Sequence, residues 1–123
     1  MPSLSNAAAN VIAKTPGESI YYGWDFTQRL AESGETISSV TSVTCTAATG
    51  TGAATGDLTI GSATVNSAAT FENDSGGTVA LSKGAQARIS GGVDGGTYTV
   101  RCRVATSAGN TRDLICTLQV RDS

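Results

Sequence analysis

The chain offers few side chains that could perform chemistry. It has 123 residues and no histidine, so a Ser–His–Asp or Cys–His arrangement for nucleophilic catalysis cannot exist. Its 10 acidic residues are scattered, and no two of them are spaced for paired acid–base work. We therefore expect no catalytic residues and no enzymatic activity.

An acidic turn and two pairs of glycines could each indicate a ligand-binding site. Glu72-Asn73-Asp74 could hold calcium, but this composition is ordinary for a turn and lacks the spacing of an EF-hand. Gly91-Gly92 and Gly95-Gly96 precede an expected strand, whereas a phosphate-binding loop opens a helix. The sequence thus predicts no metal site and no cofactor.

The three cysteines, Cys45, Cys102 and Cys116, fall on apolar positions of expected strands, where a free thiol behaves as a small hydrophobe. Their spacing matches no zinc site. Cys102 and Cys116 are equidistant from Gly109 and could face each other across a hairpin. An odd count and an N-terminus without a signal peptide favour buried thiols over a disulfide. Whether this pair is ever oxidised stays open.

The composition indicates one all-β domain. A net charge of −2 and a charged fraction of only 15% give no electrostatic case for binding nucleic acid or an anionic membrane. Gly, Ser, Thr and Ala are abundant, while strong helix formers are sparse. We expect a flexible N-terminal arm over residues 1–10 and a single domain over residues 11–123.

The clearest element is a hairpin within the stretch from Gly91 to Arg121. Alternate residues are apolar from Tyr98 to Val104 and again from Leu114 to Val120, with polar residues between them. That period of two is typical of a strand with one buried face. Ser-Ala-Gly-Asn at positions 107–110 supplies the turn, which we place near Gly109.

The entry to this hairpin predicts an immunoglobulin-like sandwich. Asp94, Gly96 and Tyr98 form the Asp-x-Gly-x-Tyr pattern of a tyrosine corner, in which the hydroxyl reaches back to the backbone a few residues upstream. Val100 stands where antibody domains have a cysteine, so their inter-sheet disulfide is not implied. With the other short β-rich segments, the pattern predicts an antiparallel β-sandwich of about seven strands. The alternative is a Gly-rich turn before an ordinary strand.

Trp24 and Phe26 share one face of the extended segment 19–30, and we expect them in the core. The alternative is an exposed ring that anchors a partner, or a Trp24 that stacks on sugar together with Tyr21.

Residues 35–46 are β-branched throughout and predict another strand. Ile37, Val40 and Val43 do not keep one parity along it. We therefore expect a bulge near Val40 that restores a single buried face.

Positive charge gathers on the other face of the hairpin. Arg101 and Arg103 should lie near Ile115, with Arg121 at the end of the strand. This basic stripe with an apolar member is either a solvated sheet face or a docking surface for a neighbouring subunit that carries acidic groups.

The stretch from about Lys14 to Val120 also carries a resemblance. The matching residues are Lys14, Pro16, Glu18, Tyr22, Asp25-Phe26, Leu30, Glu35-Thr-Ile-Ser-Ser, Ile89-Ser-Gly-Gly, Gly95-Gly-Thr-Tyr-Thr-Val and Arg103-Val-Ala-Thr-Ser-Ala-Gly-Asn-Thr-Arg-Asp. In these residues the chain resembles a family of small tailed-bacteriophage virion proteins with an immunoglobulin-like fold, described as fibre–tail adaptor or head–tail region proteins. Many relatives have tryptophan where Phe26 stands, and residues 45–81 depart by being longer and richer in Gly and Ala.

The resemblance implies a non-enzymatic virion structural protein, a fibre–tail adaptor that docks in multiple copies on tail, neck or capsid subunits. It implies a place in the virion after synthesis in the host cytoplasm, and it supplies no catalytic residues. The alternatives are a capsid decoration or cement protein and a carbohydrate-binding or adhesive surface module.

Overall fold

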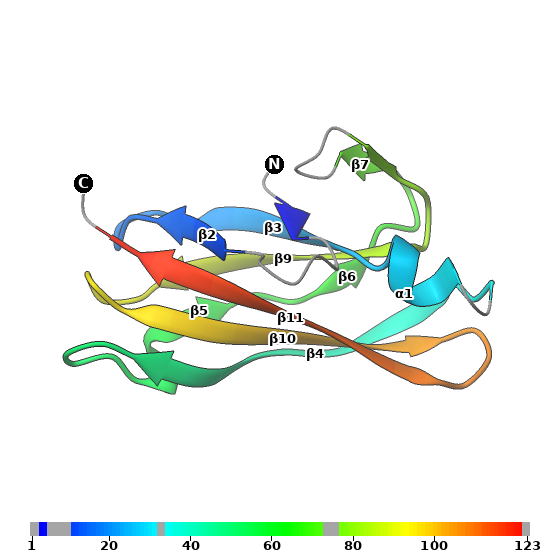
Figure 1. Ribbon diagram of the computed structural model, residues 1–123. Helices are drawn as coiled ribbons and strands as arrows, with labels where there is room; N and C mark the ends of the chain where they lie inside the picture. The colour runs from blue at the N-terminus through cyan, green and yellow to red at the C-terminus, as the bar shows by residue number, and fades with distance from the viewer. Residues whose placement is uncertain (1–2, 5–10, 32–33, 73–76, 122–123) are drawn as a thin grey trace.

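The computed structural model describes residues 3–4, 11–31, 34–72 and 77–121, and most of them lie in strands (Figure 1). Two β-sheets pack face to face, so the predicted all-β sandwich is confirmed. In chain order, the elements are β1 (Ser3–Leu4), β2 (Val11–Lys14), β3 (Ile20–Asp25), α1 (Thr27–Ala31), β4 (Ile37–Thr49), the 3-10 turn η1 (Thr55–Asp57), β5 (Leu58–Ile60), β6 (Thr64–Val65), β7 (Phe71–Glu72), β8 (Thr78–Val79), β9 (Gly84–Gly91), β10 (Thr97–Thr106) and β11 (Thr111–Val120).

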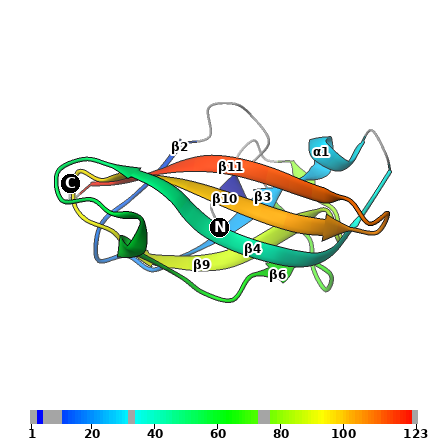
Figure 2. The same cartoon turned by 90° about the horizontal axis from the view of Figure 1, so that it is seen from below.

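One sheet has the strand order β1-β3-β9-β5, with β6 also paired to β9, and we call it the β3–β9 sheet. The other has the order β2-β11-β10-β4 and is called the β10–β11 sheet; Figure 2 shows β11, β10 and β4 side by side. The pairs β1–β3 and β2–β11 are parallel, and the other pairs are antiparallel. Of the expected arm, Ser3–Leu4 pair with β3 and the other residues lie outside the described part, so its flexibility stays a prediction.

The core lies between the two sheets. Strand β10 buries every second residue from Tyr98 to Thr106, and β11 does so from Leu114 to Val120, as the alternation predicts. A fully buried apolar side chain contributes about 1.5–3 kcal/mol relative to an exposed one. The largest fully buried side chains include Trp24, Tyr22, Tyr98 and Phe26.

The turn of the β10–β11 hairpin is centred on Ala108 rather than on Gly109. Gly109 adopts a φ of 81°, its N–H donates to Thr106 O at 3.0 Å, and Thr106 N donates to Asn110 O at 2.8 Å. This is the geometry of a three-residue loop with glycine in the left-handed position.

The expectation that two cysteines face each other across this hairpin is therefore wrong. The register pairs Cys102 with Leu114 and Val100 with Cys116, so the two thiols are diagonal neighbours on the buried face. All three cysteines of the chain are free.

The edge strand β4 is longer than its partner because it contains irregularities. The register with β10 shifts between Thr99 and Val100, between Arg103 and Val104, and between Ala105 and Thr106. Each shift adds one residue to β4. In consequence the inward positions of β4 all oppose inward positions of β10, namely Ile37, Val40, Val43, Cys45 and Ala48. The predicted bulge near Val40 is confirmed, and two more accompany it. Bulges also make an edge strand a poor template for pairing with another chain.

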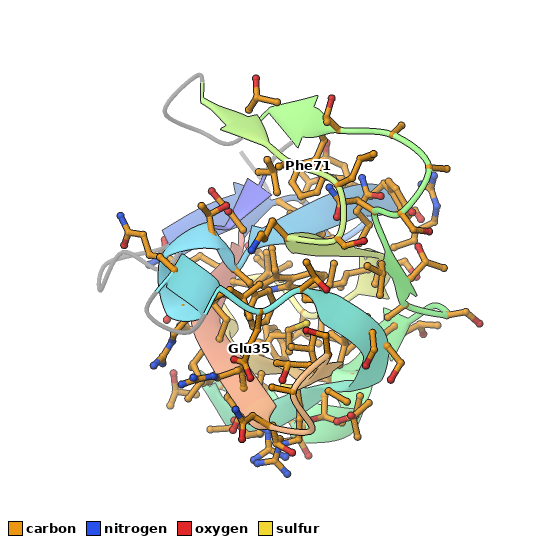
Figure 3. All side chains as sticks on the ribbon, turned by 90° about the vertical axis from the view of Figure 1, so that its right-hand side faces the viewer. Glu35 and Phe71 are labelled. Atoms are coloured by element: carbon orange, nitrogen blue, oxygen red, sulfur yellow. The ribbon has the colours of Figure 1, made fainter. Side chains whose placement is uncertain are left out.

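A third layer covers part of the outer face of the β3–β9 sheet. Strands β7 and β8 form a small hairpin, and Phe71 lies beneath it (Figure 3). A Cβ added at Gly23 of β3 or at Gly84 of β9 would lie 2.7 or 2.6 Å from the Phe71 ring, so only glycine leaves room for this ring. Asn66 ties the base of this layer, because its side chain donates to Ala80 O and accepts from Gly84 N, both at 2.9 Å.

Candidate docking surface

The tyrosine corner before β10 holds two loops together. The Tyr98 hydroxyl accepts a hydrogen bond from Val93 N at 2.9 Å and donates one to Asp57 Oδ2 at 2.8 Å. Burial raises the pKa of Tyr98, which keeps the donating proton in place. A Cβ added at Gly96 would lie 2.8 Å from this ring, and Asp94 lies exposed in the same turn. The partner Asp57 had no local sequence signal, because it is 41 residues away.

Trp24, Phe26 and Val100 lie in the core with 0% exposure. The alternative in which Trp24 stacks on sugar is therefore wrong. Tyr21 is the ring that reaches the surface, with 37% exposure, and the Arg88 guanidinium carbon lies 5.7 Å from its centroid. That cation–π contact occupies a ring face that a sugar would need.

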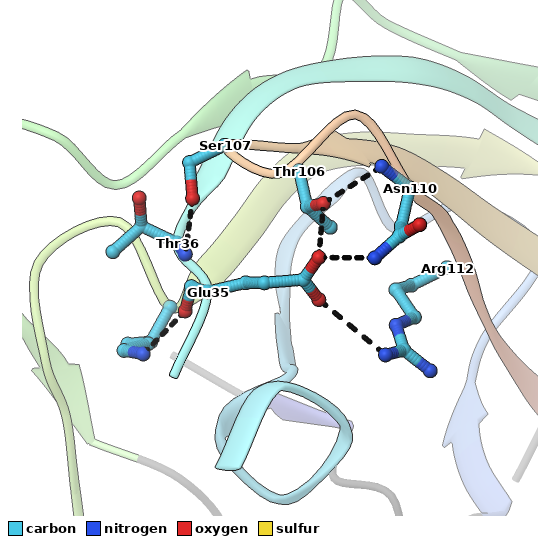
Figure 4. A network of polar contacts seen from close by, with 7 residues as sticks. Glu35, Thr36, Thr106, Ser107, Asn110 and Arg112 are labelled. Carbon is cyan, nitrogen blue, oxygen red and sulfur yellow. Dashed lines mark hydrogen bonds and ion pairs between the residues drawn. The ribbon is translucent and has the colours of Figure 1, made fainter. Parts of the chain in front are cut away.

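A buried carboxylate braces the tip of the β10–β11 hairpin (Figure 4). Glu35 is 3% exposed, accepts hydrogen bonds from the Thr106 hydroxyl at 2.8 Å and from the Asn110 side-chain amide, and forms a 3.4 Å ion pair with Arg112. The residues that follow Glu35 and Thr106 make two more hydrogen bonds to each other. This network ties the segment before β4 to the hairpin tip, and the sequence interpretation missed it.

A buried cation anchors the other end of the sandwich. Lys14 is 2% exposed, and its Nζ donates to Gly91 O at 2.6 Å and to Thr15 O at 2.7 Å. Burial lowers the pKa of Lys14, and the charge of Glu18 opposes this shift. Lys14 and Gly91 both belong to segments that carry the family resemblance, so these matches coincide with a structural contact.

Outward side chains of β10 and β11 form a surface that we call the arginine face: Arg101, Arg103, Asp113 and Ile115. The hairpin register places Arg101 opposite Ile115 and Arg103 opposite Asp113. Ile115 is 58% exposed and has the largest exposed fraction of the described large apolar side chains. The Arg103–Asp113 pair is bidentate, with Nε–Oδ1 at 2.8 Å and Nη2–Oδ2 at 3.0 Å.

The positive charge of the arginine face is only partly neutralised. Arg103 holds the pKa of Asp113 below its usual range, and the charges of Arg101 and Arg29 add to this effect. The two arginines and one aspartate of this face leave a formal net charge of +1. Within the part of the chain that the structure describes, Arg29 and Arg101 make no hydrogen bond or ion pair.

The sequence singled out Arg101, Arg103 and Arg121 as possible contact residues. The structure brings Arg101 and Arg103 to one face, and Arg121 follows the end of β11, where its Nε donates to Gln119 Oε1 at 3.3 Å. Asp113 was missed because the turn was placed one residue too late, which paired Arg103 with a different position.

The described residues contain no group of three or more metal-ligating side chains that could hold an ion. Among the same residues, no helix is long and apolar enough to span a membrane.

Comparison with known proteins supports the resemblance seen in the sequence. A comparison with curated proteins finds no match for this chain. A family model described as "Podophage GP4 fiber-tail adaptor protein gp77" matches residues 14–119, and the all-β fold is compatible with it. The match covers most of the 123 residues and confirms the prediction of a bacteriophage fibre–tail adaptor. The chain belongs to the podophage GP4 fiber-tail adaptor gp77 family.

Proposed function

We propose that the chain links fibre and tail in the virion, in multiple copies, by docking its arginine face on an acidic surface of another virion protein. The observation that carries this proposal is the exposed Ile115 directly opposite Arg101, an arginine that has no hydrogen bond or ion pair among the described residues. An exposed apolar side chain next to an arginine has the composition of an interface centre with a polar rim.

The difference between the two sheet faces supports this choice. Part of the outer face of the β3–β9 sheet is covered by the β7–β8 hairpin and the Phe71 ring. The outer face of the β10–β11 sheet leaves Ile115 in solvent. The side chains of this open face stand on long, paired strands, which hold them in a fixed arrangement before any partner arrives.

The charge of the arginine face argues for an acidic partner. Two copies of the chain that met through this face would bring two net positive patches together, which is unfavourable. Nucleic acid is a poor fit, because the whole chain has a net charge of −2. A protein surface with carboxylates around an apolar patch complements both features of this face.

Particles assembled without this chain, then incubated with the purified protein, test the proposal. Particles are sedimented and the bound chain is counted for wild type, Ile115→Asp and Leu81→Asp. Leu81 is 48% exposed and lies outside the arginine face, in the loop before β9, so it is a matched control. We expect Ile115→Asp to abolish loading and Leu81→Asp to load normally. Normal loading of Ile115→Asp would show that the docking surface lies elsewhere.

A further inference from the structure

Two arginines that are neighbours on one strand face have different environments. Arg103 is held by both oxygens of Asp113, across the hairpin. Arg101, two residues away on the same face, stands opposite Ile115 and has no such partner among the described residues. Its Nε is shielded from solvent without a hydrogen bond. A partner carboxylate that reaches the other guanidinium nitrogens of Arg101 would form a charge-assisted hydrogen bond there.

Asp113 acts on more than its direct partner. The charges of Arg101 and Arg29 both contribute to the lowered pKa of this carboxyl, so all three arginines lie within electrostatic reach of it. One carboxylate can form a bidentate pair with only one guanidinium. Asp113 therefore satisfies Arg103 and at the same time reduces the positive potential that an incoming anion meets at Arg101.

We propose that Arg101 receives a carboxylate of the docking partner beside Ile115, and that Asp113 is a built-in competitor that limits the strength of this contact. This inference rests on the proposed function, because it names the chemical group that the docking face recognises. The partner group is a carboxylate next to a branched apolar side chain, since Arg101 and Ile115 are direct cross-strand neighbours.

The arrangement has a consequence for specificity. A partner must bring both an apolar group for Ile115 and an anion for Arg101, and an anion alone meets the opposing charge of Asp113. We therefore expect the charge of Asp113 to weaken the binding of anions that lack an apolar group. Other interfaces also combine an attractive and a repulsive element in this way.

Titration of the ¹⁵N-labelled protein with isovalerate, a carboxylate on a branched apolar chain, tests this directly at low salt. Isovaleramide is the neutral isostere, and inorganic phosphate represents phosphate-bearing partners. We expect isovalerate to shift the amide signals around Arg101 and Ile115, and isovaleramide and phosphate to shift them far less. Arg101→Gln should weaken isovalerate binding by about tenfold, the scale of a charge-assisted hydrogen bond.

The sharpest expectation concerns Asp113→Asn, which should tighten isovalerate binding about threefold because an opposing charge is removed. Arg88→Gln is the control, with the same charge change as Arg101→Gln on the other sheet, and should bind like wild type. Unchanged or weaker binding by Asp113→Asn overturns the competitor role. Equal binding by Arg101→Gln and Arg88→Gln, or preference for phosphate, overturns the carboxylate site.

These outcomes are separable from a failure of the proposed function. If Ile115→Asp no longer loads on particles but isovalerate does not bind at Arg101, the docking face is supported and the assignment of a carboxylate to Arg101 is wrong. If isovalerate binds at Arg101 as expected but Ile115→Asp still loads on particles, the proposed docking role of this face is wrong. The proposed role of Arg101 in docking is then wrong as well.

Discussion

Replacing Glu35 by alanine should destabilise the protein more than any single change on its exposed surface. The Glu35 side chain is 2% exposed, and it accepts hydrogen bonds from Thr106 and Asn110 and pairs with Arg112. After the substitution these three donors lose their common acceptor at a place that water reaches poorly. The hairpin tip then loses its main polar link to the segment before β4.

The expected loss in free energy of unfolding is about 3–5 kcal/mol, and it comes mainly from the two hydrogen bonds that Thr106 and Asn110 donate to the buried carboxylate. Two of the contacts are hydrogen bonds to a charged acceptor, each of which contributes about 1.5–3 kcal/mol. The contact with Arg112 adds little, because it is 3.4 Å long and this side chain is 30% exposed, so water can solvate the freed guanidinium. Glu35→Gln keeps an acceptor oxygen and should lose about 1–2 kcal/mol.

Urea unfolding followed by Trp24 fluorescence measures this difference, because the indole is fully buried in the folded state. Asp113→Ala is the matched control: it removes a carboxylate whose side chain is 31% exposed and should cost at most about 1 kcal/mol. Equal urea midpoints for Glu35→Ala and Asp113→Ala would refute the reasoning that burial makes the Glu35 network strong.

Two further predictions concern the third layer and the core. Gly84→Ala should loosen the β7–β8 hairpin, because the new Cβ would lie 2.6 Å from the Phe71 ring. We expect the free energy of unfolding to fall by about 1–3 kcal/mol and proteolysis of this hairpin to become faster. The control is Gly17→Ala, which has open space around the new Cβ and should change neither quantity. Stability should also fall as pH rises above about 9, because burial raises the pKa of Cys116 from 9.0 to about 11 and that of Tyr22 from 10.0 to about 12. The folded state keeps protons that the unfolded chain releases in this range, so a melting temperature that stays constant from about pH 8 to pH 10.5 would contradict the assignment.

Much of the hairpin could be predicted from local sequence. The alternation from Tyr98 to Val104 marks the buried face, because the period of two belongs to neighbouring residues and needs no knowledge of the rest of the chain. The same holds for the tyrosine corner, whose contact with Val93 spans five residues. The broken parity in β4 was also enough to expect a bulge near Val40.

Local sequence could not predict which buried polar side chains form hydrogen bonds with each other. Glu35 meets Thr106 across 71 residues of chain, and Tyr98 meets Asp57 across 41, because sheet order and not sequence spacing brings these groups together. Local pattern contains no information about which buried donors and acceptors satisfy each other.

The arginine face shows which features local sequence predicts and which features only the register of the folded hairpin decides. The residue types of β10 were sufficient to expect a basic stripe beside Ile115, since alternation assigns each side chain to a face. Because the turn is centred on Ala108 rather than Gly109, the register places Asp113 opposite Arg103 and Ile115 opposite Arg101. Which charges are paired thus follows from the register of the folded hairpin, because a small shift in a turn changes every cross-strand neighbour along both strands.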